Sequence, residues 1–421
     1  MYFARMLSKF VLHNNFYRLL LIVFCLSAFL IYSFDNIKTF KIYTSDYLQL
    51  EKTYEDVELY FEKRKSWNTS NLGTILFKNK DPPDLPKTDR VYKILVWKYW
   101  KWLQNRHVFS FDRNRTADPL HNCGVRNCLF SGDSEDIKTA DAVVIHIQKG
   151  QLPNVTTRNP NQRWIFLSDE SPKNAFSMAR ARPKLRELAG VFNWSMTFRS
   201  DSDVPVPYGR TIQRILAHTS EVPFWGQKRR DTFVTILISN CGVSRRMEYL
   251  KELEKHIDVD VYGKCSKDHR ESCPGHFSAD CKVMAEYIFY LVFENSECHE
   301  YLTEKGFYHA YSKGAIPIIM GPSVQECEAL LPPNSFLHVD NYRSAADLAK
   351  YIKYISEDES KILEYHAWRK DFEVVNEHGY FGSTSYHYCR VCEALNYNDK
   401  SVKIYDEEML KTFLDPALSC R

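Results

Sequence analysis

Residues 290–321, YLVFENSECHEYLTEKGFYHAYSKGAIPIIMG, contain the pattern that decides the fold. An apolar run at 288–293 predicts a buried strand, residues 303–312 predict a helix, and the apolar run at 315–320 predicts a second strand. Strand, helix and parallel strand form a βαβ unit, whose ligand crevice lies at the carboxyl ends of its strands. Lys305 falls at the start of the helix, a position that suits a diphosphate.

The same alternation of strands and helices occurs in two blocks of the chain. We expect an α/β fold with one Rossmann-like domain over residues 91–226 and another over 227–376, facing each other across a cleft. The strands predicted outside the βαβ unit lie at 92–97, 142–147, 164–167, 191–197, 232–238, 259–262 and 336–339, and further helices at 177–188, 245–255 and 344–372. Residues 377–421 have no clear sheet pattern and are predicted to form a C-terminal tail.

Length, charge and missing motifs narrow the class of protein. A chain of 421 residues with 44% hydrophobic residues is long enough for two domains. Its formal charge of +3, without a dense block of Lys and Arg, argues against a nucleic-acid partner. The sequence has no GxGxxG motif and no P-loop motif, which argues against a dehydrogenase and an NTPase.

An uncharged apolar run, LLLIVFCLSAFLIYSF, occupies residues 19–34 near the N-terminus. We interpret it as a transmembrane signal anchor rather than a cleaved signal peptide, because no small-residue cleavage site follows. Residues 1–18 would then form a cytosolic tail. Residues 35–90 are polar and contain the proline-rich segment 82–86 near their end, so we expect them to form a stem.

Cysteines and glycosylation sequons indicate on which side of the membrane the body lies. Twelve cysteines fit an oxidising compartment. Four sequons, all beyond the anchor, begin at Asn68, Asn114, Asn154 and Asn193. These features predict a single-pass type II protein with a lumenal body.

Two short motifs suggest metal sites, but another explanation is preferred for each. Asp201-Ser-Asp203 resembles a metal-binding Asp-x-Asp motif, yet a lone acidic triplet in a polar loop is usually a turn. Cys389-x-x-Cys392 lacks the second pair that a zinc finger requires, so a structural disulfide is preferred in an oxidising lumen. We therefore predict no metal site.

The stretch at 289–323 closely resembles the signature of the α1,3-fucosyltransferases, glycosyltransferase family 10. Further similarities follow in the family's order, at 164–172 (WIFLSDESP), 197–209 (TFRSDSDVPVPYG), 239–241 (SNC), 259–265 (VDVYGKC) and the terminal Cys-x-x-Cys. The forms SNC and VYGKC are more like those of invertebrate members. The resemblance implies a GT-B fold, the donor GDP-β-L-fucose, and inverting transfer to the 3-hydroxyl of a GlcNAc residue in a glycoprotein or glycolipid glycan. It also implies residence in the Golgi membrane.

The resemblance implies roles for individual residues. Glu170 matches the family's proposed base, which takes the proton of the acceptor hydroxyl, and Asp169 is the reserve candidate. Glu304 matches a residue that contacts fucose, while Lys305 and Arg246 would hold the diphosphate. The other expected donor contacts are Asn240, Tyr262, Asn295 and Tyr301.

The family pattern also suggests that two cysteines of the first domain, Cys123 and Cys128, pair with Cys389 and Cys392, although the partner of each stays open. One departure from the family is Gly306, which stands where a larger residue is usual and weakens the start of a helix by up to about 1 kcal/mol. No obligatory cofactor is expected, and any stimulation by Mn²⁺ need not come from a bound catalytic ion.

Two alternatives stay open beside a fucosyltransferase. One is a catalytically silent Golgi protein of the same fold that binds a GDP-sugar or a glycan, and the other is an enzyme of this fold that uses another nucleotide-sugar. The intact acidic and basic residues of the predicted cleft argue against the silent protein. The sequence does not indicate whether the acceptor is a core or an antennal GlcNAc residue.

Overall fold

The computed structural model describes residues 57–85, 89–105, 107, 118–121, 123–215, 221–269, 272–274 and 279–421. The chain divides into two compact units, Met1–Leu59 and Tyr60–Arg421, and every element below belongs to the second unit. The predicted cytosolic tail (1–18), the predicted anchor (19–34) and the Asn114 sequon lie outside the described residues. Among the described residues, no helix has both the length and the apolar character needed to cross a membrane.

The first predicted domain contains a parallel sheet with the strand order β2-β1-β3-β4-β5-β6. Its strands are β1 (Tyr92–Val96), β2 (Cys128–Ser131), β3 (Ala142–His146), β4 (Arg163–Ser168), β5 (Trp194–Thr197) and β6 (Val204–Pro205). Along β1, Ile94 and Val96 belong to one apolar cluster and Leu95 belongs to another. Both faces of the sheet are therefore covered, as expected for a parallel sheet.

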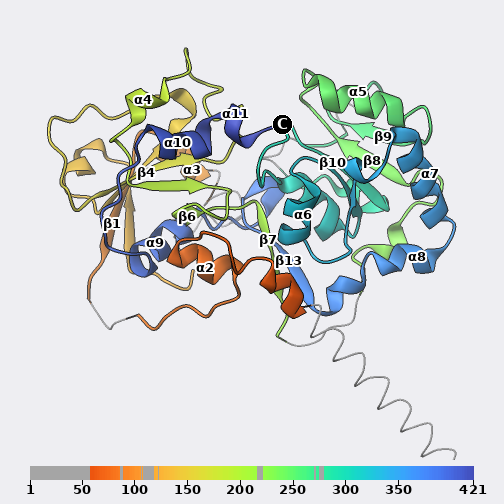
Figure 1. Cartoon of the computed structure of the whole chain (residues 1–421), viewed down its shortest axis with the longest axis horizontal. Coiled ribbons are helices and arrows are strands. Elements are labelled where there is room, and N and C mark those ends of the chain that lie inside the picture. The colour runs from red at the N-terminus through yellow and green to blue at the C-terminus, as the bar shows by residue number, and fades with distance from the viewer. Residues whose placement is uncertain are drawn as a thin grey trace, which may run out of the picture. The chain divides into compact units, whose positions relative to one another are not determined.

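Helices from distant parts of the chain cover these two faces (Figure 1). Residues of α2 (Asn71–Phe77) and α9 (His387–Tyr397) belong to one apolar cluster. Residues of α4 (Leu185–Leu188) and α10 (Glu407–Leu414) belong to the other. The C-terminal residues therefore complete the first domain, although they follow the second domain in the sequence.

The second predicted domain contains a parallel sheet with the order β12-β11-β10-β8-β9. Its strands are β8 (Val234–Leu237), β9 (Val259–Tyr262), β10 (Phe289–Phe293), β11 (Ile316–Met320) and β12 (Leu337–His338), and its helices are α5 (Ser244–Leu253), α6 (Val324–Leu330), α7 (Ala345–Ser356) and α8 (Glu359–Glu364). All residues of β10 and β11 are buried. The βαβ unit predicted at 290–321 thus forms the centre of this sheet.

A two-stranded antiparallel ribbon lies between the two sheets (Figure 1). The chain leaves the first sheet along β7 (Gly209–Gln213) and returns along β13 (Phe372–Asn376). A Cβ atom at Gly209 would collide with the Phe307 ring and with the carbonyl oxygen of Val375, so only glycine fits this crossing. The ribbon therefore passes directly against the segment that follows β10.

Several predicted elements differ from the observed ones. The predicted helix at 177–188 is wrong for most of its length, because a regular helix forms only at α4. The predicted helix at 303–312 is instead a π-helix, η6 (Lys305–Ala310), followed by a short 3₁₀ helix, η7 (Tyr311–Lys313). Strands β2, β7 and β13 were not predicted, because their burial patterns mix buried residues with partly or fully exposed ones.

The predicted stem, residues 35–90, is wrong from Tyr60 onward, because this segment belongs to the folded body. The hydroxyl of Ser70 caps α2, whose Leu72, Leu76 and Phe77 are buried in the core of the first domain. The buried Arg64 donates hydrogen bonds to the carbonyl oxygens of Phe77 (3.0 Å) and Ala329 (2.7 Å).

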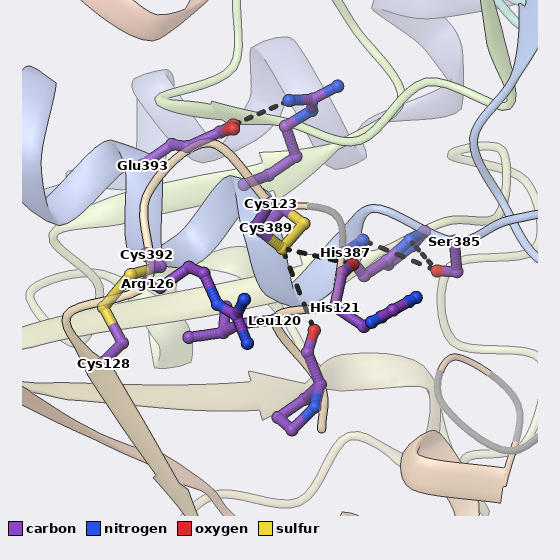
Figure 2. The surroundings of a disulfide bond; sticks show 12 residues. Leu120, His121, Cys123, Arg126, Cys128, Ser385, His387, Cys389, Cys392 and Glu393 are labelled. Atoms are coloured by element: carbon purple, nitrogen blue, oxygen red, sulfur yellow. Dashed lines mark hydrogen bonds and ion pairs between the residues drawn. A yellow bond between two sulfur atoms is a disulfide. The ribbon is translucent and has the colours of Figure 1, made fainter. Parts of the chain in front are cut away.

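Five disulfides join all the described cysteines except Cys327. They are Cys123–Cys389, Cys128–Cys392, Cys241–Cys265, Cys273–Cys281 and Cys298–Cys420. The first two attach α9 to the first domain, and Figure 2 shows both bonds at this contact. The pairing that the resemblance left open is thus resolved, while Cys327 is a buried free thiol.

One predicted glycosylation site does not fit the fold. The Asn193 side chain is buried, accepts hydrogen bonds from the Trp164 amide (3.0 Å) and Arg158 (3.1 Å), and donates one to the Lys403 carbonyl (2.9 Å). A glycan on this nitrogen would break the last bond and would have no space. Asn68 and Asn154, by contrast, are exposed.

The ribbon between the sheets ends at a buried carboxylate whose charge we expect to stabilise the fold. Glu377 lies 2.6 Å from Arg210 and 2.9 Å from Arg390. Burial opposes its ionisation, but the two arginines outweigh burial and lower the pKa of Glu377 to about 2. We predict that Glu377→Gln lowers the free energy of unfolding at neutral pH by about 3 kcal/mol.

Because the folded-state pKa of Glu377 is depressed, its contribution is complete above the unfolded pKa of about 4.3 and is lost as pH falls toward 2. Thermal unfolding of wild type and Glu377→Gln should therefore differ most at neutral pH and converge in acid. Glu373→Gln on the same ribbon is the control, since Glu373 is half-exposed and 3.9 Å from Arg214. Equal effects of the two substitutions would contradict the prediction.

Candidate active site

The turn after β10 is organised by the buried carboxylate of Glu294. Its Oε1 accepts hydrogen bonds from the backbone amide (2.8 Å) and the hydroxyl (2.9 Å) of Thr303. The ammonium of Lys305 lies 3.2 Å from its Oε2. Glu294 therefore fixes the start of the π-helix η6, a helix type that often marks a functional site.

Glu304 and Lys305 form a charged pair at this helix start. The Lys305 Nζ atom lies 3.3 Å from Glu304 Oε1. Burial opposes the charge of each, but Glu294 and Glu304 raise the pKa of Lys305 to about 12. Lys305 and His309 in turn lower the pKa of Glu304 to about 2. Both groups are therefore ionised at neutral pH.

Arg246, from α5, supplies a second cation next to the same turn. Its side chain is buried and donates hydrogen bonds to the carbonyl oxygens of Phe293 (3.2 Å) and Asn240 (2.6 Å). Burial lowers the pKa of Arg246, and the charge of Glu294 opposes this shift. The guanidinium thus connects the end of β10 with the exposed loop that follows β8.

Glu170, from the end of β4, meets this region from the first sheet. The hydroxyl of Tyr301 donates a hydrogen bond to Glu170 Oε2 (3.1 Å). Burial and the neighbouring Asp169 raise the pKa of Glu170, while Tyr301 and Lys305 act in the opposite direction. A carboxylate with raised proton affinity therefore lies beside the residues that follow β10.

Asp169 has different surroundings, although it precedes Glu170 directly. It is buried, and its carboxylate lies 3.3 Å from His378 Nε2 and 3.7 Å from His146 Nε2. Its backbone carbonyl accepts a hydrogen bond from Tyr208 (2.7 Å). Asp169 thus lies among histidines, whereas Glu170 contacts Tyr301.

Two further contacts connect the sheets around Glu170. The hydroxyl of Ser171 donates to that of Ser296 (2.8 Å). The amide and hydroxyl of Ser200 both donate to the buried Glu300 carboxylate, each at 2.7 Å. Glu300 has a φ of 53°, a conformation whose cost is on the order of 1–3 kcal/mol and which these bonds offset. In the sequence, the signal that could have indicated these contacts is the occurrence of polar residues directly after the predicted strands.

The other predicted donor-binding residues differ in whether they contact Glu170. Tyr301 is buried and contacts Glu170 directly. Asn295 is half-buried and accepts a hydrogen bond from Ser296 (3.0 Å). Tyr262 is buried, and its hydroxyl interacts with that of Tyr287 (2.7 Å), so it is part of the core network of the second sheet.

The acidic triplet Asp201-Ser-Asp203 has a structural explanation. Asp201 forms a bidentate ion pair with Arg199. Asp203 accepts hydrogen bonds from the Ser195 amide (2.8 Å) and the Tyr405 hydroxyl (2.7 Å). Both carboxylates therefore bind protein donors in this arrangement.

Comparisons with known proteins identify the family to which this chain is similar. The family models "Fucosyltransferase, N-terminal" and "Glycosyltransferase family 10 (fucosyltransferase) C-term" match residues 89–209 and 227–410. The chain is 33% identical to 4-galactosyl-N-acetylglucosaminide 3-alpha-L-fucosyltransferase FUT6 of Pan troglodytes, over 72% of this chain and 80% of that protein. It is 32% identical to alpha-(1,3)-fucosyltransferase 7 of Mus musculus, over 77% of each chain.

A third relative is named for another linkage. It is 3-galactosyl-N-acetylglucosaminide 4-alpha-L-fucosyltransferase FUT3 of Bos taurus, 33% identical over 64% of this chain and 70% of that protein. Since the two family models together match more than half of the sequence, the assignment does not depend on any single relative. The chain belongs to glycosyltransferase family 10, the fucosyltransferases.

Proposed function

We propose that this protein transfers L-fucose from GDP-β-L-fucose, with inversion, to the 3-hydroxyl of a GlcNAc residue in a glycoprotein or glycolipid glycan. Membership in the family and the names of two relatives as 3-α-L-fucosyltransferases support the donor and the linkage. The observation that carries the proposal is the contact of Glu170 with Tyr301, which brings a carboxylate of the first sheet to the residues that follow β10. The two sheets would then form the GT-B arrangement.

In the proposed mechanism, Glu170 acts as the general base. Burial raises the pKa of Glu170 and so increases its affinity for the proton of the acceptor hydroxyl. The hydroxyl oxygen attacks the anomeric carbon of fucose while the bond from that carbon to the diphosphate breaks, which inverts the configuration. The hydrogen bond from Tyr301 would hold the carboxylate in position for this step.

The charges that follow β10 would stabilise the transition state. Glu304 carries a negative charge that could stabilise positive charge developing on the fucose ring. Lys305 and Arg246 carry the positive charges that the departing GDP requires. Because side chains supply this charge, the proposed mechanism has no obligatory catalytic metal ion in the donor site, and any stimulation by Mn²⁺ need not come from a bound catalytic ion.

We place the protein in the Golgi membrane as a type II protein with its body in the lumen. The disulfides of the described body, which suit an oxidising compartment, support this location. The exposed sequons at Asn68 and Asn154 also support it. Immunofluorescence of the tagged full-length chain against Golgi markers tests the location.

The decisive assay incubates the purified full-length chain with GDP-fucose and a panel of core and antennal GlcNAc glycans, followed by linkage analysis of the product. We expect fucose on the 3-hydroxyl of GlcNAc. Fucose on the 4-hydroxyl would overturn the linkage but not the family. Donor binding without transfer to any acceptor would favour the silent protein, and a larger thermal shift with another nucleotide would favour another donor.

We predict that Glu170→Gln lowers kcat by about 10²–10⁴ at neutral pH, because the amide cannot accept the proton. Binding of GDP, measured by calorimetry, should change little, since Glu170 comes from the first sheet. Glu135→Gln is the matched control, because Glu135 is exposed in the first domain. Retained transfer in Glu170→Gln would place the base elsewhere.

For the donor half, we predict that Lys305→Ala and Glu304→Ala each abolish most transfer while the full-length protein still folds and is expressed. Lys305→Ala should also weaken GDP binding, because it removes a cation from the proposed diphosphate site. Lys350→Ala, at an exposed position of α7, is the control. Near-normal turnover in either variant would remove that residue from the site.

A further inference from the structure

Four histidines surround the carboxylate of Asp169 in the interior of the first domain. His107, His146, His378 and His387 are each 4% exposed or less, as is Asp169. They come from separate segments: His107 lies beyond α3 (Trp100–Gln104), His146 ends β3, His378 follows β13, and His387 begins α9. The fold thus gathers imidazoles from distant parts of the sequence around one buried acid.

Three of these side chains have the arrangement of a metal site. One ligand atom each from His107, Asp169 and His387 lies within 4.8 Å of the other two. The rings of His107 and His387 stack with their centroids 3.9 Å apart. This spacing is close enough for the three groups to share one ion after small side-chain adjustments.

A hydroxyl group orients both rings. Ser385 Oγ lies 2.7 Å from Nδ1 of His107 and 3.3 Å from Nδ1 of His387. An imidazole whose Nδ1 is hydrogen-bonded in this way presents its Nε2 to a metal, and such outer contacts are typical of metal-ligating histidines. The Nε2 atoms of both rings are buried.

Two of the three ligands, His387 and Asp169, are attached to rigid parts of the fold. Cys389, two residues after His387, forms the disulfide with Cys123, and Figure 2 shows His387 and Ser385 beside this bond. Asp169 follows the fully buried strand β4, and its carbonyl accepts the Tyr208 hydrogen bond (2.7 Å). A pre-organised set of ligands binds a metal with little loss of conformational entropy.

We propose that His107, Asp169 and His387 form a binding site for a divalent transition metal of the zinc class. Two imidazoles and a carboxylate suit Zn²⁺ or Co²⁺, whereas Mg²⁺ and Ca²⁺ prefer ligands that are all oxygen. His378, whose Nε2 lies 3.3 Å from the Asp169 carboxylate, is placed to complete the site.

This site is distinct from the proposed donor site, and no short sequence motif indicates it, because its ligands come from separate segments. Its ion would hold the turn that begins at Asp169, and Glu170 is the next residue of that turn. We therefore assign the metal a structural role in the first domain. The proposal does not depend on which sugar the enzyme transfers.

The test uses the purified full-length chain, stripped with a chelator and titrated with Co²⁺. We expect one Co²⁺ per chain, with the visible absorption of a low-coordinate site and displacement by Zn²⁺. His107→Gln and His387→Gln should each weaken Co²⁺ binding by about tenfold or more. His121→Gln is the matched control, because His121 is exposed near the same disulfide and should leave the binding unchanged.

Failure of the wild type to bind Co²⁺ or Zn²⁺ stoichiometrically would overturn the proposal, and so would unchanged binding in both histidine variants. Circular dichroism establishes whether the variants fold. If they do not, X-ray absorption of the Zn²⁺-loaded wild type decides. A spectrum with nitrogen and oxygen ligands and the outer-shell scattering of imidazole would support the site. A spectrum with a sulfur ligand would overturn it and assign the metal to the thiol of Cys327 or another cysteine.

Discussion

The buried carboxylate of Glu294 is the constraint on which the candidate site depends. A charge at the end of a central strand, with its side chain removed from water, is stable only when neighbouring donors satisfy it. Thr303 and Lys305 supply those donors, so the chain after β10 must return to this carboxylate. That return sets the start of η6 and places the Glu304–Lys305 pair beside Arg246. The position of the Glu304–Lys305 pair, which we propose contacts the donor, is therefore a consequence of one local hydrogen-bonding requirement.

A second set of constraints determines how the two sheets meet. The ribbon of β7 and β13 carries the chain across and back, and Glu377 binds arginines from β7 and α9 at its end. Disulfides attach α9 to the first domain, while Cys298–Cys420 attaches the C-terminus to the segment after β10. Such long-range disulfides stabilise the fold in part because they reduce the conformational entropy of the unfolded chain. Since the sheets are held in this way, Glu170 and Tyr301 can share a hydrogen bond.

Sequence patterns predicted an element correctly where the residues of one short segment are enough to determine its structure. Runs such as 288–293 and 315–320 are apolar throughout, because central strands of a covered parallel sheet are buried on both faces. Patterns failed where the partner is distant. The strands β7 and β13 carry mixed residues because they pair with each other away from the large sheets. The segment around α2 was predicted to be a stem because most of its residues are polar, although one apolar face of α2 packs on the first sheet.

The sequence by itself determined the α/β class, the family, and the residue types that the chemistry requires, because these depend on local periodicity and on motifs of adjacent residues. Only the tertiary structure decided which of two adjacent acids contacts the residues after β10: Glu170 contacts Tyr301, and Asp169 lies among histidines. It also decided the disulfide partners and the burial of Asn193. The physical reason is that burial and contact depend on which distant segments converge, and no single segment carries that information.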